Sequence, residues 1–142
     1  MAISPDDTED LILSCRYGDI DDVKSFIDRF GTDFIGQVRD DHGNTLLHMA
    51  SANGHTELLN ILLPIVPSSL LSAQNNSGST ALHWAALNSQ FGTARALVDF
   101  PGGPGVDLID IKNAAGRSPL GEAEAVGWEE GAKWMVEVMK LD

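Results

Sequence analysis

One stretch of this sequence occurs twice, 35 residues apart. The segment GNTLLHMASANGH at residues 43–55 is echoed by GSTALHWAALNSQ at residues 78–90. Self-similarity at a fixed period of roughly 20–50 residues is typical of proteins that stack copies of one small unit, because a single copy cannot bury its apolar face alone. The 142 residues therefore predict one array of about four stacked units.

Each copy carries the signals for two consecutive helices. Thr45 is placed to cap a helix at residues 46–52, and Asn53-Gly54 can end it in a left-handed conformation. Apolar residues then recur at helical spacing until Pro64, which we expect to break the second helix. The next copy follows the same order from Thr80, with its second helix near residues 90–99.

That later copy departs from the pattern at three positions in its second half. Ser89 stands where glycine is usual, and Gly92 and Thr93 stand where helix formers are usual. We therefore expect the second helix of this copy to be the weakest of the inner ones.

The two ends of the chain carry atypical units, as expected where one side of an array faces solvent. The first unit is expected to start near residues 7–10, to stop its first helix at Gly18 and to cap its second helix with Asp19. In the last unit, Ser118-Pro119 is a strong helix start, and Glu122 and Glu124 predict a helix with one wet face. Connectors at 64–71 and 100–105 predict an extra helical turn after Pro67 and an exposed loop.

The repeated T-x-L-H-x-A wording resembles the T-P-L-H-x-A signature of the ankyrin repeat. The resemblance implies an all-α ankyrin-repeat solenoid of about four helix-turn-helix repeats with short hairpin-like turns between them. We place a single domain at 1–142, with repeats at about 7–39, 40–74, 75–112 and 113–142. Such arrays usually present a surface to another protein, so the fold favours a protein-binding module.

Charge is unevenly distributed along the chain. Of 21 acidic and 9 basic residues, 11 acidic and 4 basic ones lie in residues 1–45, and 8 and 4 lie in residues 101–142. Residues 46–100 are nearly neutral, while the whole chain has a net charge of −12. This balance disfavours direct nucleic-acid binding and favours a basic protein partner, although acidity can also serve solubility alone.

The sequence predicts a protein of the cytoplasm and nucleus. Cys15 is the only cysteine and is expected to be a small core residue, so no intramolecular disulfide is possible. The first ten residues lack the pattern of a secretory signal, and no apolar run reaches the length of a membrane span. We expect a monomer that does not associate with membranes.

His48 and His83 are the strongest candidates for chemistry, and the repeat pattern gives them a structural role instead. Thr45 and Thr80 each precede a histidine by three residues, so the two side chains can share hydrogen bonds and tie one repeat to the next. A zinc site would need closely spaced cysteine or carboxylate partners. We find no phosphate-binding or nucleophile motif, and we predict no metal, no cofactor and no enzyme activity.

Four segments together resemble one fungal family of ankyrin proteins. They are LILSCRYGDIDDVK, TLLHMASANGH, TALHWAALN and EAEAVGWEE, and the resemblance covers about residues 8–140. The family is the dedicated chaperone of ribosomal protein S-three of the small subunit. It implies a non-enzymatic protein that shields a basic ribosomal protein during ribosome biogenesis. No acidic extension of the kind found in that family follows the last repeat here, so the groove and end repeats are expected to bind the client.

Ankyrin recognition in general places the partner-binding face on turn tips and on the ends of inner helices. Trp84 is expected inside or at the edge of the groove, and His42 and His55 are expected to be exposed turn residues. Each position in this face could equally be a solvated turn residue. The candidates are Arg16, Tyr17, Asp40, Asp41, His42, Asn44, Ala52, Asn53, Asn76, Ser77, Ser79, Leu87, Asn88 and Arg117.

A second function class stays open at this stage. The chain could be a regulatory ankyrin scaffold or an inhibitor of a kinase or transcription factor, with its acidity incidental. A dominant basic ribosomal partner favours the chaperone, whereas equal binding of unrelated regulators favours the scaffold.

Overall fold

A computed structural model describes residues 3–140 as an array of paired helices, with no strand among those residues. The pairs are α1 (Pro5–Tyr17) with α2 (Ile20–Phe30), α3 (Leu46–Ala52) with α4 (Thr56–Leu62), α5 (Ala81–Leu87) with α6 (Phe91–Asp99), and α7 (Pro119–Ala125) with α8 (Glu129–Lys140). Three short 3-10 helices join them: η1 (Leu63–Ile65), η2 (Ser68–Ser72) and η3 (Gly105–Asp110). The prediction of an all-α solenoid of about four helical pairs is confirmed.

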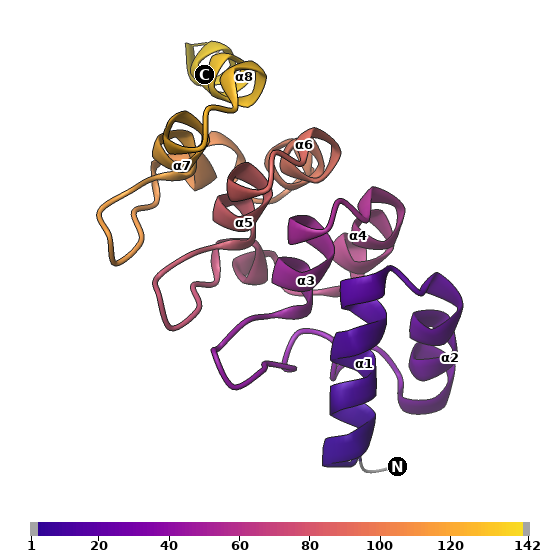
Figure 1. The fold of residues 1–142 in the computed structure, drawn as a ribbon. Coiled ribbons are helices and arrows are strands. Elements are labelled where there is room, and N and C mark those ends of the chain that lie inside the picture. The colour runs from indigo at the N-terminus through magenta and orange to yellow at the C-terminus, as the bar shows by residue number, and fades with distance from the viewer. Residues whose placement is uncertain (1–2, 141–142) are drawn as a thin grey trace.

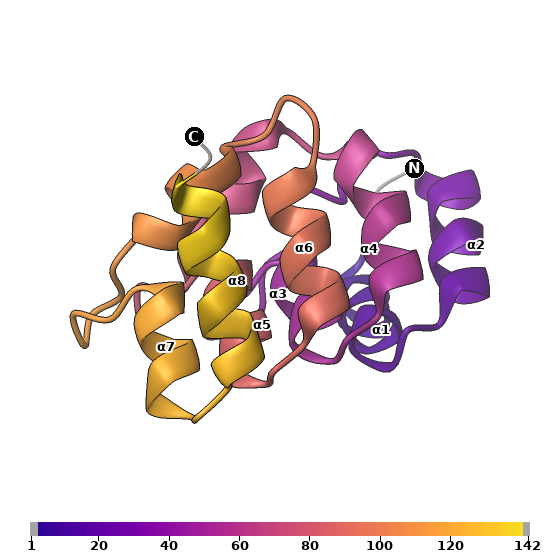
Figure 2. The same ribbon diagram turned by 90° about the horizontal axis from the view of Figure 1, so that it is seen from above.

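The helices form two rows along the array. The first helix of each pair packs on the first helix of the next, so that α1, α3, α5 and α7 make an inner row (Figure 1). The second helices make an outer row, which Figure 2 shows from above in the order α2, α4, α6 and α8. Between the rows lies one continuous core of fully buried leucines, including Leu47, Leu59, Leu82 and Leu97.

Caps start and stop most of these helices where the sequence predicts. Thr45 and Thr80 cap α3 and α5, Asp19 caps α2, and Ser118 caps α7 with Pro119 in its first turn. Gly18 ends α1 in the left-handed conformation, with φ 72°. Short polar caps satisfy the amides that a helix start leaves unpaired, which explains why these boundaries can be read from sequence.

One helix boundary differs from the expectation. Helix α1 begins at Pro5, not near residues 7–10, because Ser4 and Asp7 form a reciprocal capping box at its start. Pro64 follows the end of α4 at Leu62, as predicted, although the chain continues into a short 3-10 helix. It lies in the first turn of η1, where its missing amide costs no internal hydrogen bond.

The two connectors hold short 3-10 turns. The helical turn expected after Pro67 is present as η2. The Gly/Pro-rich segment 100–105 is irregular up to Pro104, but Gly105 already belongs to η3. Gly103 packs close to the buried Leu71, so this loop lies partly against the array rather than fully in solvent.

Candidate protein-binding groove

Three short turns project from the inner row, and we call them fingers. They comprise residues 40–44, 75–79 and 113–117, and each closes through a hydrogen bond between its first and last residues. In each finger the side chain of the first residue accepts hydrogen bonds from two backbone amides of its own turn. Asp40 Oδ1 accepts from His42 N and Asn44 N, and the Oδ1 atoms of Asn75 and Asn113 do the same at matching positions.

The fingers stack on one another through backbone hydrogen bonds. The amide of Asn76 donates to the carbonyl of His42 over 2.9 Å, and the amide of Ala114 donates to the carbonyl of Ser77 over 2.9 Å. Gly43 has φ 78° at the tip of the first finger, a left-handed conformation that glycine adopts without steric strain. The three fingers therefore form one edge of the array, along the side of the inner helices (Figure 1).

Buried imidazoles tie each inner helix to the following finger. His48 Nδ1 accepts from the amide of Thr45 over 3.0 Å and lies 2.9 Å from its hydroxyl, while Nε2 donates to the carbonyl of Ser79 over 2.8 Å. His83 repeats this arrangement with Thr80 and the carbonyl of Arg117. Because a carbonyl can only accept, the proton of each imidazole is on Nε2.

Burial also keeps these two imidazoles uncharged. Desolvation lowers the pKa of His48, and the hydrogen bond to the Ser79 carbonyl offsets only part of that effect. Desolvation lowers the pKa of His83 in the same way, against a hydrogen bond to the Arg117 carbonyl. Neutral, fully bonded histidines suit a structural tie and leave no free nitrogen for a metal or a proton transfer.

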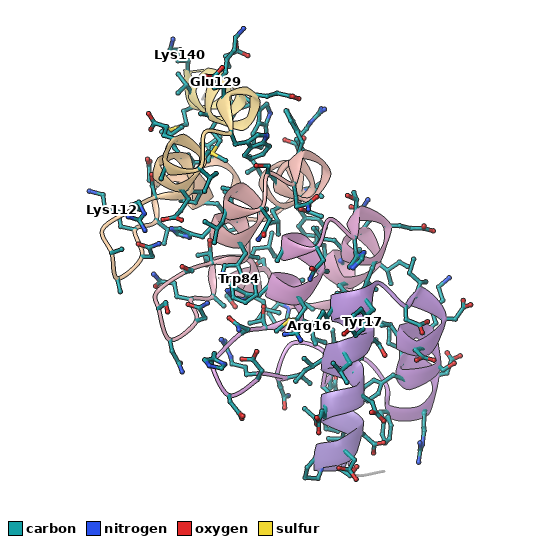
Figure 3. All side chains as sticks on the ribbon, in the orientation of Figure 1. Arg16, Tyr17, Trp84, Lys112, Glu129 and Lys140 are labelled. Carbon is teal, nitrogen blue, oxygen red and sulfur yellow. The ribbon has the colours of Figure 1, made fainter. Side chains whose placement is uncertain are left out.

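A groove of about 710 Å³ runs between the fingers and the inner helices. Its floor includes Trp84, whose ring meets the ring of His48 edge to face with centroids 5.3 Å apart. Leu87 lines it with 47% of its surface exposed, and Arg16 lines it from the last turn of α1 (Figure 3). The groove thus offers an apolar floor bordered by amides, which suits contact with a protein side chain.

The two carboxylates that line this groove are already engaged. Partial burial raises the pKa of Asp40, but hydrogen bonds from the side chain and amide of Asn44 and from the amide of His42 lower it by more. Glu122 is 5% exposed and forms an ion pair with Arg117. The middle of the groove is therefore close to neutral, and the uncommitted acids lie toward the ends of the array.

The structure brings most of the predicted partner-binding residues together. Those that line the groove are Arg16, Asp40, His42, Asn44, Asn76, Ser77, Ser79, Leu87 and Arg117. Asp41 lies in an adjoining cleft, and Tyr17, Ala52, Asn53 and Asn88 lie at the ends of the inner helices. Tyr17 is 73% exposed, the largest exposure among the exposed apolar side chains of residues 3–140. Their contact with a partner stays a prediction.

The exposure of four side chains differs from the expectation. Asn44 and Ser79 are buried in the base of their fingers, and the Asn44 side chain bonds to Asp40 and Asn75, so these two serve the fold. His55 is not an exposed turn residue, because its Nε2 donates to the carbonyl of Arg16 over 2.7 Å. Of the two acids expected to give α7 a wet face, Glu124 is exposed, but Glu122 is buried beside Arg117.

Sequence reasoning missed several groove residues. Asn75 matches Asp40 at an offset of 35 residues, and Asn113 matches Asn75 at an offset of 38, so extending the repeat alignment into the turns would have found them. Trp84 was expected at the groove but was not assigned to the binding face. Glu9, Ile12 and Leu13 line the adjoining cleft together with Pro5 from the early first turn of α1, and no repeat signal marks them.

Metal binding and thiol reactivity are two further kinds of chemistry that these residues could support. In residues 3–140, no three His, Cys, Asp or Glu side chains are grouped closely enough to hold a metal ion. Cys15 is buried, and desolvation raises its pKa to about 12, so its thiol is not reactive at neutral pH. Within the same residues, none of the helices combines the length and apolarity needed to cross a bilayer.

Comparison with known proteins places the chain in a class. Residues 11–110 match the family "Ankyrin repeats (3 copies)". An ankyrin repeat-containing protein of Schizosaccharomyces pombe is 38% identical over 118 residues, which are 83% of this chain and 76% of that protein. The chain therefore belongs to the ankyrin-repeat family, and its fold and groove are those of a protein-binding module.

One solved structure resembles this chain over nearly its whole length. A chain in the crystal structure of the yeast ribosomal protein Rps3 in complex with its chaperone Yar1 superposes with a TM-score of 0.87 at 28% identity. The match covers 96% of this chain and 95% of the other, and it confirms the resemblance to the S-three chaperone family. The nuclear factor NF-kappa-B p105 subunit of Gallus gallus is 30% identical over 82 residues, but these are only 8% of that protein and reflect the repeat alone.

Proposed function

We propose that this protein is a dedicated, non-enzymatic chaperone that binds and shields a basic protein of the small ribosomal subunit, the organism's own Rps3, until it is incorporated. It acts as a monomer in the cytoplasm and nucleus. The observation that carries the proposal is the near-complete structural match, from the first repeat to the last, with a chain of the Rps3–Yar1 complex. Likeness to the ankyrin fold alone would not require the terminal repeats to match as well.

Charge supports a basic client. A net charge of −12 attracts a positively charged protein over distances comparable to the screening length of the solution. The 11 acidic residues within the first 45 concentrate that attraction at the N-terminal end of the array. Binding there also competes with the non-specific RNA contacts that a free basic protein would make.

The groove and the neighbouring end of α1 supply exposed apolar side chains. Tyr17 and Leu87 are large, exposed and apolar, and Trp84 lies half-buried between the fingers and the helices. Removing such side chains from water on binding gives affinity that salt does not screen, and aromatic anchors are over-represented among the residues that dominate interface energies. Steering by charge and holding by apolar contact together suit a chaperone that must capture and then shield its client.

Co-purification from the source organism tests the proposal. The expected result is one dominant partner, a small basic ribosomal protein identified by mass spectrometry, at a ratio of one to one. Equal recovery of several unrelated neutral or acidic regulators would favour the scaffold instead. Recovery of no ribosomal protein at low salt would contradict the chaperone function outright.

Groove variants give the matched test with purified proteins. Tyr17→Ala and Leu87→Ser should each weaken binding of Rps3 about tenfold, because each removes an exposed apolar contact. Val136→Ser is the control, since Val136 is exposed on α8 outside the groove. Asp40 is unsuitable for such a test, because its carboxylate holds the first finger together.

A further inference from the structure

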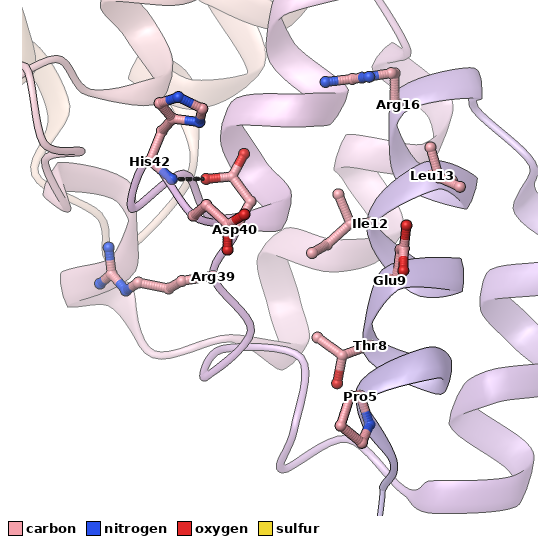
Figure 4. A pocket seen from close by; sticks show the side chains of 10 residues that line it. Pro5, Thr8, Glu9, Ile12, Leu13, Arg16, Arg39, Asp40 and His42 are labelled. Atoms are coloured by element: carbon pink, nitrogen blue, oxygen red, sulfur yellow. Dashed lines mark hydrogen bonds between the residues drawn. The ribbon is translucent and has the colours of Figure 1, made fainter.

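A second hollow adjoins the groove at the N-terminal end of the array. This cleft has a volume of about 510 Å³ and shares Arg16, Asp40 and His42 with the groove. Helix α1 forms one wall, with Glu9, Ile12 and Leu13, and the first finger forms the other (Figure 4).

The inner repeats fill the matching space with their own chain. The second finger lies against the first through Asn76 N and His42 O, and the third lies against the second through Ala114 N and Ser77 O. The residue that matches Asn76 and Ala114 in the first finger is Asp41. In residues 3–140 the amide of Asp41 has no hydrogen-bond partner, because no finger precedes it there.

The imidazole tie is also missing at this end. Aligning the left-handed residues Gly18 and Gly54 puts Ile12 at the position of His48. An isoleucine cannot donate to the carbonyl of Asn44, which receives only the amide of Asp40 within the described residues. Helix α1 also starts five residues before the position that matches Leu46, so its extra turn forms a wall opposite the finger.

We propose that this cleft holds an extended segment of the client. One backbone carbonyl of that segment accepts from the amide of Asp41, an apolar side chain packs on Ile12 and Leu13, and a lysine or arginine meets Glu9 and Asp41. The identity of the client rests on the proposed function, whereas the mode of binding rests on the cleft itself.

Backbone geometry and charge both select this occupant. Carbonyls inside a helix are used internally, whereas an extended chain leaves its carbonyls free to accept from the finger edge, as added strands do at open sheet edges. Asp40 is saturated by its own turn, and the Nη1 group of Arg39 donates to the carbonyl of Gly43. The cleft lining carries three acids, Glu9, Asp40 and Asp41, against Arg16 and Arg39, so its balance stays acidic. Of these acids, Glu9 and Asp41 have side chains without a partner within the described residues and are free to meet a cation of the segment.

Two substitutions at one position separate the backbone contact from the charge. Asp41→Ala removes the carboxylate and keeps the amide, whereas Asp41→Pro removes both. Proline suits the position, because Asp41 is the second residue of a turn closed by Gly43 N and Asp40 O. The probe is full-length Rps3 of the same organism, titrated at 0.1 M and 0.5 M salt.

The expected outcome is a stepwise loss of affinity. Asp41→Ala should bind about threefold more weakly at 0.1 M salt, with the difference shrinking at 0.5 M. Asp41→Pro should bind about tenfold more weakly than Asp41→Ala at both salt concentrations, because a backbone hydrogen bond is lost. Equal affinities of the two variants would overturn the extended mode while leaving the chaperone function standing. Absence of binding by the unaltered chain would overturn both.

Two further measurements guard against folding effects. In the unaltered chain, NMR should show hydrogen exchange of the Asp41 amide at least tenfold slower in the complex than in the free protein; unchanged exchange in a saturated complex overturns the proposal.

Leu13→Ser should weaken binding about fivefold, and its control Val136→Ser should not. These two residues are 38% and 37% exposed at opposite ends of the array, and equal effects would also contradict the cleft.

Discussion

The inner repeats and the first repeat differ in whether hydrogen bonds close the space beside the finger. In the inner repeats, a neutral imidazole and a stacked finger close that space with hydrogen bonds. In the first repeat, Ile12 replaces the imidazole, and the finger edge at Asp41 is left without a partner among residues 3–140. The same unit thus closes this space where a neighbouring finger is present and leaves it open in the first repeat, where we propose that the client binds.

The largest expected effect comes from breaking an inner tie. His48→Ala should destabilise the protein by about 3 kcal/mol, because it opens a cavity and leaves the carbonyl of Ser79 and the start of α3 with fewer partners. Gly121→Ala is the comparison at the matching position of the last repeat. Its new methyl group meets only ordinary contacts, so stability should be unchanged or higher. Urea unfolding measures the free energy of unfolding of both variants. Equal losses would show that the hydrogen bonds of His48 do not stabilise the fold.

The second-largest expected effect is a loss of stability of the inner repeats on acidification. Burial lowers the pKa of His48 and His83 in the folded state, so the unfolded chain binds more protons as the pH falls below the ordinary histidine pKa of 6.5. Their contribution to stability is complete above that pH and is lost as the pH falls through it toward the folded-state values. The melting temperature should therefore drop between pH 7 and pH 5, above the range in which Asp40 is protonated. A flat profile in that window would contradict buried neutral imidazoles.

A smaller effect on stability is expected at a position where the two inner repeats differ. Ser89 has φ 55° at the end of α5, where the preceding repeat has Gly54 with φ 74°. Ser89→Gly should raise the free energy of unfolding by about 1 kcal/mol, since a left-handed backbone is strained for any residue with a side chain. Gly54→Ala should lower it. Thermal unfolding of the pair checks the sign, and a loss of stability on Ser89→Gly would contradict the strain.

The smallest expected effect concerns one buried hydroxyl in α3. Ser51 is fully buried, and its Oγ has no hydrogen-bond partner within the described residues. Ser51→Ala should therefore leave stability unchanged or raise it by about 1 kcal/mol at most, because an unpaired polar group is removed from the core. Differential scanning calorimetry can resolve the change, and a clear loss of stability would mean that the hydroxyl has a partner after all.

Sequence reasoning was most successful where one side chain determines the local structure. Thr45, Thr80, Asp19 and Ser118 each cap a helix by themselves, so their helices could be placed without knowing the packing. Thr93 shows the limit. It looked like a poor helix former, but its hydroxyl donates to the carbonyl of Ser51 from the neighbouring repeat, a contact that no local pattern reveals.

The candidate site was harder to predict than the fold for a related reason. Exposure of a turn residue depends on its neighbours in the stack, which is why Asn44, Ser79 and His55 were wrongly expected at the surface. The cleft depends on where α1 begins and on a finger edge without a neighbour, and both are properties of the assembled array. Repeat patterns describe what units share, whereas this cleft arises from what the first unit lacks.

The rate of association with purified Rps3 at several ionic strengths tests the central claim most directly. An acidic ankyrin array that captures a basic client should form a one-to-one complex whose association rate falls at least about tenfold between 0.05 M and 0.5 M salt. A rate that stays constant over this range, or no complex at all, would contradict the account.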